Sequence, residues 1–438
     1  MARKPRGESY RDELLVAIEE VLPPYLFSRF FVHGNADWTP QKLAWMAALM
    51  SWDEAPTLGV RFENSRRLLR SLHPRWTLPT SYSGFIQALQ QHTPQLRTAM
   101  VQRLRCDTRL EQFWRAHGWL AFAVDGSRFE APRTVANERK LECAGNEGSN
   151  PQVFQTTLQH VGTGLPWDFR LGPGTDSERR HLDDMLSALP AQSLLLADAG
   201  FASFDLCTWL CSQGHFFLLR VGGNIRLLTA LGWEYEIEGQ TVYLWSQARR
   251  DKPPLVLRLI VIRHECNLPV YLLTNVLDPE KLSDEIAGTL YRLRWGIEVY
   301  YRTTKQTLGH RRLLSHSPEA ALLEQTWVVL GSWLMQFIAV RAVHEAGCSP
   351  RQWSPAKARN AIRRAMRGAP TNDAAGKSLR DELAAAVVDC YARRRPKQNR
   401  PWPRKKEQRP PKPPKFQQAT PFERQRAQQL WHDARLVL

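Results

Sequence analysis

The order of the short apolar segments between residues 119 and 221 constrains the fold more than any other feature of this sequence. WLAFAVDGSRF begins at residue 119 and is a short apolar run with alternation, which is typical of a strand. PQVFQTTLQHVGTGLPWDFRLGPG begins at residue 151 and reads as two strands around a turn that contains glycine. We therefore expect the sheet to begin with an antiparallel meander.

The segments that follow alternate between helix and strand patterns. A helix is expected at about 176–189, with an Asp or Ser as its N-cap and Pro190 as its stop. SLLLADAGF predicts a buried strand that ends at Asp198, FDLCTWLCSQG predicts a helix, and HFFLLRV predicts another strand. Three strands followed by alternating helices and strands predict a mixed α/β layer.

Different patterns flank this layer. Residues 1–117 carry apolar residues at spacings of three and four, as in DELLVAIEEVL, which predicts a separate helical module. Residues 222–275 contain the strand-like segments WEYEIEG, TVYLWSQ, PLVLRLIVIR and PVYLLTN, so we expect a β-strand insertion. ALLEQTWVVLGSWLMQFIAVRAVHEAG, from residue 321, predicts a buried core helix, because its polar residues interrupt it too often for a membrane span.

The charge of the chain points to an acidic partner. Sixty Lys and Arg stand against 43 Asp and Glu, which gives a formal net charge of +17. Such an excess favours nucleic acid. The N-terminus MARKPRGESYRDE lacks the apolar segment of a secretory signal, so we expect a soluble intracellular chain and no membrane partner. Of seven scattered cysteines only Cys207 and Cys211 are close, and they fit a buried helix face better than a zinc site.

The segment from Arg393 to Lys415 concentrates this charge. It carries eleven Lys or Arg against one Glu, together with seven prolines. Such a composition cannot bury enough apolar surface to order itself. This segment is either a solvated linker or a basic arm that lies on nucleic acid. The arm is favoured, because densely spaced positive charges release counterions when they bind nucleic acid.

A helix is expected from near Ser283, a suitable N-cap, to near Gly309 at its C′ position. Its apolar residues form one arc that would face the core. At about 100° per residue, four other side chains fall within a separate stripe about 60° wide. These are Tyr291, Arg294, Glu298 and Lys305.

Three carboxylates stand where an α/β sheet forms sites. Asp125 ends the first expected core strand, Asp198 ends the fourth, and Glu298 lies on the stripe of the later helix. Acids placed together repel one another unless hard divalent cations such as Mg²⁺ bind between them. Two such ions about 3.5–4 Å apart would activate a water or a 3′-hydroxyl and stabilise the leaving oxygen of a phosphodiester.

Each of these features alone has an ordinary reading. D-G-S and A-D-A-G-F are typical turn sequences, and a Glu flanked by cations is typical of a solvated helix face. The combination favours chemistry, because Arg294 and Lys305 suit a scissile phosphate held beside Glu298.

The spacing Y-x2-R-x3-E-x6-K formed by the four stripe residues resembles the signature of the insertion-sequence-four superfamily of DDE transposases. VDGSRF at the first acid, LLLADAGF at the second, and YLLTN shortly before LYRLRWGIE agree with it, so that the resemblance spans roughly residues 80–340. It implies a ribonuclease-H-like mixed sheet with a β-strand insertion between the second and third acids. The 100 residues that separate Asp198 from Glu298 leave room for such an insertion.

The resemblance also implies cut-and-paste DNA transposition. Asp125, Asp198 and Glu298 would bind two Mg²⁺ ions, with Mn²⁺ as a substitute; water would nick the transposon end, and the freed 3′-hydroxyl would attack next. Tyr291, Arg294 and Lys305 would bind DNA. In members that form a DNA hairpin, the Tyr and Arg bind the displaced phosphate, and an aromatic residue of the insertion holds a flipped base.

Several positions leave this assignment incomplete. Many relatives carry Arg directly after the second acid, where this chain has Ala199. Nothing local selects the base-holding aromatic, and each candidate also fits a core position. The candidates are Trp233, Trp245 and Tyr271, while Trp295 borders the stripe and could pack beneath the insertion. His310, Arg311 and Arg312 follow the helix and would either contact backbone phosphate or lie in a solvated loop.

The expected class is α/β, with helical N-terminal and C-terminal regions around the ribonuclease-H-like core. The expected segments are a helical DNA-binding module (1–117), the first part of the catalytic core (118–221), the β-strand insertion (222–275), the second part of the core (276–345), a helical region (346–392), and a basic Pro-rich arm with a terminal helix (393–438).

The expected partners are transposon terminal inverted repeats and target DNA, bound by a homodimer in a synaptic complex. A cytoplasmic, nucleoid-associated location is expected for such a protein. Two rival functions remain open on the sequence: a transposase-derived DNA-binding repressor without catalysis, and a nuclease that cleaves but does not join. The intact acids and stripe argue against the repressor.

Overall fold

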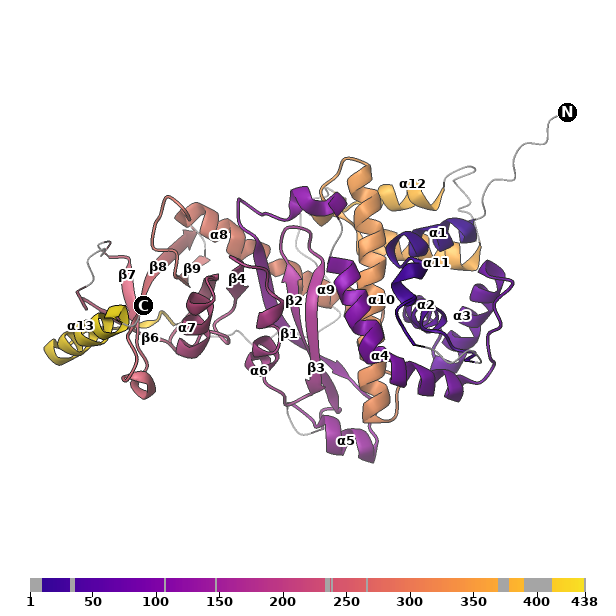
Figure 1. The fold of residues 1–438 in the computed structure, drawn as a ribbon, viewed down its shortest axis with the longest axis horizontal. Coiled ribbons are helices and arrows are strands. Elements are labelled where there is room, and N and C mark those ends of the chain that lie inside the picture. Colours follow the sequence, from indigo (N-terminus) through magenta and orange to yellow (C-terminus); the bar gives the residue numbers. More distant parts are fainter. Residues whose placement is uncertain are drawn as a thin grey trace. The chain divides into compact units, whose positions relative to one another are not determined.

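The computed structural model describes residues 10–31, 36–105, 108–145, 148–232, 237, 239–264, 267–368, 378–389 and 412–436 (Figure 1). By its internal contacts the chain divides into two compact units. The first unit comprises Met1–Trp114, Gly126–Met185 and Ile297–Asp389, and the second comprises Arg115–Asp125, Leu186–Gly296 and Cys390–Leu438.

The strands form a mixed sheet of ten, in the order β10-β6-β7-β8-β9-β5-β4-β1-β2-β3. Their bounds are β1 (Ala121–Glu130), β2 (Gln152–His160), β3 (Pro166–Pro173), β4 (Leu194–Ala197), β5 (Phe216–Val221), β6 (Arg226–Thr229), β7 (Thr241–Leu244), β8 (Leu255–His264), β9 (Asn267–Thr274) and β10 (Lys415–Gln418). β1, β4 and β5 run parallel, whereas β2 and β3 form the expected antiparallel meander. The predicted α/β class with a mixed sheet is confirmed, and β6 to β9 form strands in the segment where the insertion was expected.

The second unit holds the parallel strands and the insertion. β4 is a buried apolar run, as expected for a strand covered on both faces, and α7 (Phe204–Ser212) connects it to β5. From β5 the sheet continues through β9, β8, β7 and β6, each antiparallel to the last. β10 then pairs with β6 in parallel register, and α13 (Pro421–Leu436) anchors this segment through Trp431, whose Nε1 donates to the carbonyl of Pro254 at 3.1 Å.

The first unit is mostly helical. Its helices are α1 (Tyr10–Val21), α2 (Pro40–Trp52), α3 (Leu58–Leu72), α4 (Tyr82–Arg105), α5 (Val135–Leu141), α6 (Glu178–Asp183), α10 (Pro318–Glu345), α11 (Pro355–Arg367) and α12 (Leu379–Ala384). α6 is shorter than the helix expected at 176–189, although Ser177 caps it as predicted. The N-terminal helices share a core with α10, because Trp52 Nε1 donates to the carbonyl of Gly331 and Trp327 Nε1 donates to Thr93.

α10 is the central helix of the first unit (Figure 1). It is the one helix among the described residues that is long and apolar enough to cross a membrane by length and composition, but 94% of its most apolar window is buried. The burial of α10 fits the core helix predicted from its sequence.

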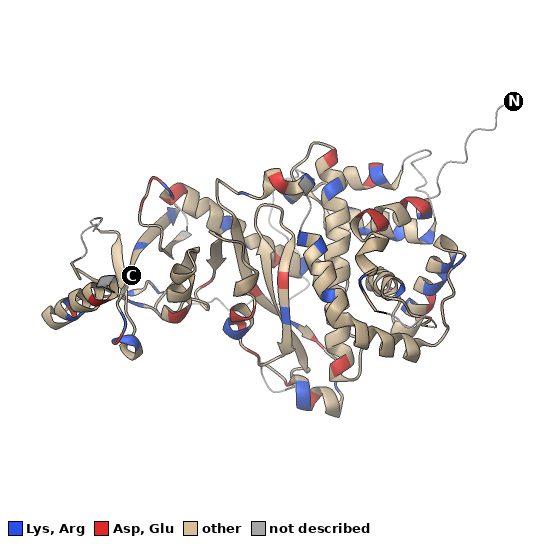
Figure 2. Cartoon of the chain, viewed as in Figure 1, with Lys and Arg blue, Asp and Glu red and all other residues tan. Residues whose placement is uncertain are grey.

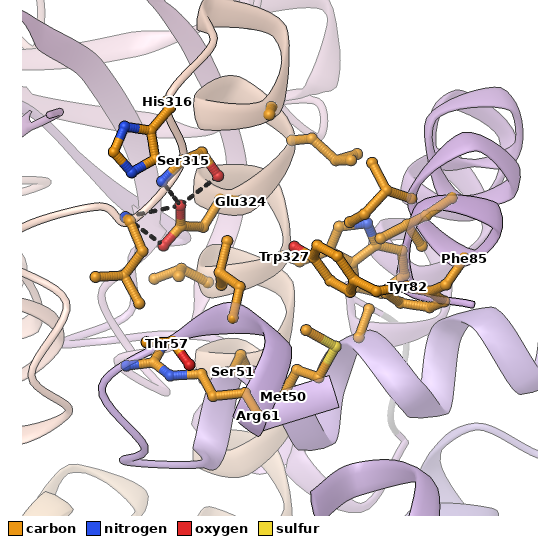
Figure 3. A pocket seen from close by; sticks show the side chains of 18 of the residues that line it. Met50, Ser51, Thr57, Arg61, Tyr82, Phe85, Ser315, His316, Glu324 and Trp327 are labelled. Carbon is orange, nitrogen blue, oxygen red and sulfur yellow. Dashed lines mark hydrogen bonds between the residues drawn. The ribbon is translucent and has the colours of Figure 1, made fainter. Parts of the chain in front are cut away.

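A pocket of about 670 Å³ lies between α2, α3, α4 and α10 of the first unit (Figure 3). Aromatic rings of Tyr82, Phe85 and Trp327 line one side of it. On the other side Glu324 accepts hydrogen bonds from the amides of Leu314 and Ser315, which fixes that loop. His310 lines this pocket, whereas the three predicted acids and the stripe residues do not.

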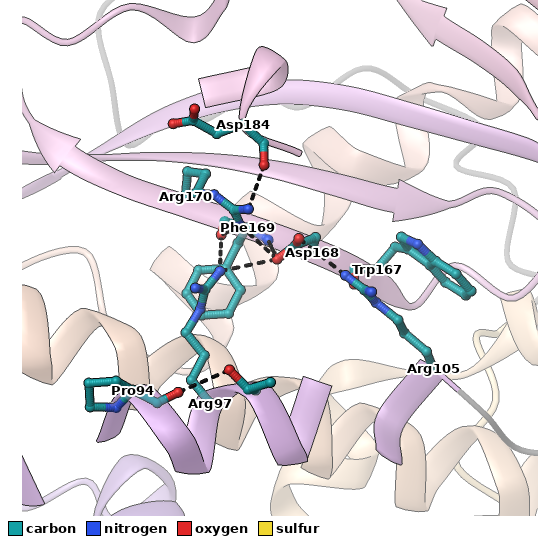
Figure 4. Close-up of polar contacts among 9 residues, drawn as sticks. Pro94, Arg97, Arg105, Trp167, Asp168, Phe169, Arg170 and Asp184 are labelled. Carbon is teal, nitrogen blue, oxygen red and sulfur yellow. Dashed lines mark hydrogen bonds and ion pairs between the residues drawn. The ribbon is translucent and has the colours of Figure 1, made fainter. Parts of the chain in front are cut away.

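Three guanidinium groups surround the buried carboxylate of Asp168 on β3 (Figure 4). Arg97 and Arg105 reach it from α4, and Arg170 lies on β3 itself. The two α4 guanidiniums also donate to the carbonyls of Phe169 and Trp167. Because β3 is the last strand of the sheet, these contacts attach a helix to an edge that would otherwise offer unpaired carbonyls.

The positive charge is not confined to one described element. In Figure 2 the positions of Lys and Arg alternate with those of Asp and Glu along the helices and strands of both units. The basic arm from Arg393 to Lys415 lies almost wholly outside the described residues, and at its end Lys415 begins β10.

Candidate functional site

Asp125 and Asp198 lie level with each other on neighbouring parallel strands. β1 pairs with β4 from Ala121↔Leu194 to Ala123↔Leu196, and each aspartate stands two residues beyond the last pair. Side chains two residues apart point to the same face of a sheet, and adjacent strands are about 4.8 Å apart. The pairing therefore places both carboxylates side by side on one face of the second unit.

Asp125 differs from its predicted place at a strand end. β1 continues through Asp125 and Gly126 to Glu130, so the D-G-S sequence is not a turn. A Cβ on Gly126 would lie 2.6 Å from the Phe154 ring and 2.7 Å from Glu178 Oε1, so glycine is needed for the strand to pass these side chains. Asp198 directly follows β4, as predicted.

Two other side chains lie close to Asp198. The Tyr291 hydroxyl is 3.5 Å from Asp198 Oδ1, and Arg220 Nη1 is 3.6 Å from the same oxygen. Burial raises the pKa of Tyr291 to about 12, because the opposing charges of Arg294 and Arg220 offset it only in part. The phenol therefore stays protonated at neutral pH and can donate to an oxygen.

The helix that carries the stripe is interrupted rather than continuous. Ser283 caps it by accepting a hydrogen bond from the amide of Ile286, and Gly309 ends it with φ +86°, as predicted. Between them lie α8 (Asp284–Leu293), a break at Arg294, α9 (Trp295–Arg302) and a π turn (Thr303–Thr307). The prediction of one regular helix was wrong, so the 100° spacing does not hold from Tyr291 to Lys305.

Local hydrogen bonds account for both irregularities. The amide of Arg294 bonds back to the carbonyl of Tyr291, three residues earlier, which tightens the chain at the end of α8. The Thr304 hydroxyl donates to the carbonyl of Tyr300, a contact that bends helices.

The stripe is not a solvated helix face. Tyr291 is 7% exposed and Arg294 is 3% exposed, with the Arg294 guanidinium 5.4 Å from the centre of the Tyr291 ring. Glu298 on α9 and Lys305 in the π turn are half-buried. Burying a charge is costly unless it is paired, so burial at two of the four positions favours a functional or structural role over simple solvation.

Lys305 contacts the strand that carries Asp125. Its Nζ donates to the hydroxyl of Ser127 at 2.7 Å and lies 4.9 Å from the centre of the Phe129 ring. Lys305, Glu298 and these two β1 residues belong to the first unit, whereas Asp125, Asp198, Tyr291 and Arg294 belong to the second. The convergence of Glu298 with the two aspartates stays a prediction.

Arg311 and Arg312 are ion-paired. Both contact Glu130 at the end of β1, at 3.3 and 3.0 Å, and remain about half and three-quarters exposed. Burial alone would raise the pKa of Glu130, but hydrogen bonds from Arg312 and Asn150 and the nearby positive charges lower it overall. A role for either arginine in DNA binding stays a prediction.

His310 lies neither against phosphate nor in a solvated loop. It is 2% exposed, and its Nε2 lies 2.8 Å from the carbonyl of Ser51. Burial lowers its pKa to about 4, helped by the charge of Arg61. The phosphate contact considered for His310 is therefore wrong.

The aromatic residues considered for holding a flipped base differ in how deeply they are buried. Trp245 is a core residue whose Nε1 donates to the carbonyl of Lys252, Tyr271 is half-buried, and Trp233 lies outside the described residues. Trp295 is 55% exposed, so its expected packing beneath the insertion is not found.

Two arginines near the site were not among the residues predicted from the sequence. Arg220 is the penultimate residue of β5, in the HFFLLRV segment, where a cation after an apolar run was the available signal. Arg258 is fully buried in β8; it donates to the carbonyl of Leu282 at 2.8 Å and pairs with Asp284 in the first turn of α8. Arg258 thus ties the insertion to the helix that carries Tyr291.

The oxygen donors of Asp125 and Asp198 fit a hard divalent cation, because two adjacent carboxylates on one sheet face match the ligands that Mg²⁺ prefers. Among the residues that the structure describes, no group of three or more His, Cys, Asp or Glu side chains is placed to hold a metal ion. The same finding gives Cys207 and Cys211 no described zinc-binding group.

Comparison with known proteins identifies similar sequences. The family model described as "Transposase DDE domain" matches residues 119–334. The transposase InsG for insertion sequence element IS4 of Escherichia coli is 28% identical over 294 residues, which cover 62% of this chain and 64% of that protein. A putative transposase for insertion sequence element IS4SA of Synechocystis is 19% identical over 186 residues, covering 41% and 52%. The chain thus spans less than two thirds of the length of either relative.

A solved structure of a piggyBac transposase synaptic complex with hairpin DNA is also similar. It aligns over 86% of both chains with a TM-score of 0.43 and 12% identity.

Proposed function

We propose that this chain is a DNA transposase of the DDE type that cleaves transposon ends and joins them to target DNA, because residues 119–334 match the family model described as "Transposase DDE domain". The observation that carries the proposal is the level placement of Asp125 on β1 and Asp198 directly after β4. Two carboxylates on one sheet face serve metal-dependent phosphodiester chemistry and have no evident use in a repressor.

Each acid has a stated role in this proposal. Asp125, Asp198 and Glu298 would hold two divalent cations, Mg²⁺ or Mn²⁺, which supply an activated water or 3′-hydroxyl and stabilise the leaving oxygen. By holding the two cations in fixed positions, the three carboxylates would position the scissile phosphate. Glu298 would join the aspartates from α9 in the assembled protein–DNA complex.

The remaining polar residues would bind and orient DNA. Tyr291, a phenol that is protonated at neutral pH, would donate to a phosphate oxygen, and Arg294 beside it would hold the strand next to the cleaved bond. Lys305, fixed against Ser127, would contact a phosphate further along. Arg311 and Arg312 would add weaker contacts, because Glu130 already neutralises part of their charge.

Joining two ends requires two copies of the chain, so we propose a homodimer on DNA that acts on terminal inverted repeats and target DNA. Residues 1–117 would supply most of the sequence-specific contacts. The expected location is the cytoplasm, in association with the nucleoid.

The experiment is a time course on a labelled duplex that carries the terminal repeat flanking this reading frame, with Mg²⁺ and a target plasmid. The wild-type protein should produce nicked, then double-cleaved, then joined products. The Asp198→Asn variant should bind the duplex and form no product. The control is Asp205→Asn: Asp205 lies on α7 and forms a half-exposed ion pair with Arg249, so this variant should keep wild-type rates.

The rival functions give different products. A repressor would bind the duplex without cleaving it at any metal concentration. A nuclease would cleave but leave no joined product.

A further inference from the structure

A row of charged residues crosses three parallel strands of the second unit. β4 pairs with β5 from Leu194↔Phe216 to Ala197↔Leu219, so the next positions, Asp198 and Arg220, are level. Asp125 is level with Asp198 on the other side. The row therefore reads carboxylate, carboxylate, guanidinium, with the cation at the β5 end.

Arg220 contacts Asp198 loosely. Its Nη1 lies 3.6 Å from Asp198 Oδ1, which is within ion-pair range but longer than a good hydrogen bond. The side chains are 31% and 42% exposed, so the attraction is partly screened by water. Such a contact can be exchanged for another anion at low cost.

The surroundings of Arg220 favour an anionic ligand. On β9 it stands opposite Leu272, which offers no charge. Arg220 and Arg294 both act on the Tyr291 phenol, which stays neutral. Ala199, the residue after Asp198, adds no cation of its own, so Arg220 is the guanidinium that reaches this carboxylate in the described part of the second unit.

We propose that Arg220 is a phosphate-binding residue of the active site that exchanges partners when metal binds. Without a divalent cation it neutralises Asp198. When a divalent cation occupies Asp198, the guanidinium is repelled and donates instead to a non-bridging oxygen of the DNA phosphate. This inference rests on the proposed function, since it needs both a cation and DNA at Asp198.

The proposal predicts two changes of opposite sign for Arg220→Ala. Removing a cation that competes for Asp198 should tighten Mn²⁺ binding to the protein without DNA, by about two- to fivefold. Removing a phosphate ligand should weaken binding of the terminal-repeat duplex in Ca²⁺ by about tenfold, because a charge-assisted hydrogen bond is lost. Arg220→Lys should restore the Mn²⁺ affinity to the wild-type value and the DNA affinity only in part.

The measurements are Mn²⁺ titration followed by electron paramagnetic resonance and duplex binding followed by fluorescence anisotropy. The control is Arg249→Ala, which removes another ion-paired arginine of the second unit and should change neither affinity. If Arg220→Ala lowers the melting temperature, Arg220→Gln, which keeps most of the side-chain volume, must show the same two opposite changes.

A fall in both affinities, or no change in either, would overturn the inference. Failure of the proposed function looks different: the wild-type protein itself would then bind no Mn²⁺, whether or not it binds the duplex. Wild-type binding of both, with Arg220 variants that match it, rejects only the role of Arg220.

Discussion

The ammonium group of Lys305 donates a hydrogen bond to the hydroxyl of Ser127 at 2.7 Å. This contact joins the π turn after α9 to β1, the strand on which Asp125 stands two residues before Ser127. The last cation of the stripe is thus fixed to the strand of the first acid.

Lys305→Ala should weaken binding of the cleaved transposon end by about 1–3 kcal/mol, because a charge-assisted phosphate contact is lost. Duplex binding measured by anisotropy in Ca²⁺ gives the value. Ser127→Ala is the matched control, since it removes the same hydrogen bond and keeps the charge. Equal losses in both variants would show that Lys305 acts by holding β1 and not by binding phosphate.

Arg294→Lys should slow a step after nicking more than it weakens end binding. Arg294 is buried beside the Tyr291 ring, and an ammonium group cannot replace its planar two-pronged hydrogen bonding. Nicked, double-cleaved and joined products are resolved over time on a labelled end. Arg292→Lys, on the exposed side of α8, should leave all steps unchanged. Unaltered rates in Arg294→Lys would remove Arg294 from the mechanism.

The protein should lose stability as the pH falls from about 6.5 to about 4. Burial lowers the pKa of His310 and of His160 to about 4 in the folded chain, whereas an unfolded histidine titrates near 6.5. Each neutral histidine therefore contributes stability that is present above pH 6.5 and is lost towards pH 4, on the order of 3 kcal/mol.

Urea unfolding across this pH range measures the effect. His310→Gln should flatten the dependence, and His432→Gln, an exposed residue of α13, should leave it as in the wild type. A wild-type slope in His310→Gln would mean that His310 is not held neutral.

Deleting residues 393–411 should weaken DNA binding on every sequence and reduce its salt dependence, because the arm would act through phosphate charge. The deletion stops before Lys415, which begins β10. Anisotropy with specific and scrambled duplexes at several salt concentrations tests this. If only the preference between the two duplexes changed, the arm would read bases.

The strand positions of the site could be predicted because burial leaves a local signature. LLLA before Asp198 and the apolar run before Asp125 are short enough to identify as strands, and the register that makes the aspartates level follows from their pairing. The break at Arg294 could not be predicted, because a helical wheel assumes constant geometry and the Thr304 back-bond that bends the helix depends on the side-chain rotamer.

Contacts between residues that are far apart in the chain could not be predicted from the sequence, for a different reason. Arg220 meets Asp198 through the β4–β5 register, and Arg258 meets Asp284 through the folding of the insertion. Neither pair is close in the chain, so no spacing rule identifies it. The burial of His310 was missed because a histidine followed by two arginines is typical of an exposed basic segment.

The most direct test of the central claim, that Asp125, Asp198 and Glu298 form one metal site, is Mn²⁺ binding to the protein on a transposon-end duplex, counted by electron paramagnetic resonance. Two ions per chain are predicted for the wild type, and Glu298→Gln should weaken their binding at least about tenfold, as should Asp125→Asn and Asp198→Asn. Glu285→Gln, in the first turn of α8, should retain both ions. Wild-type Mn²⁺ binding in Glu298→Gln would contradict the account.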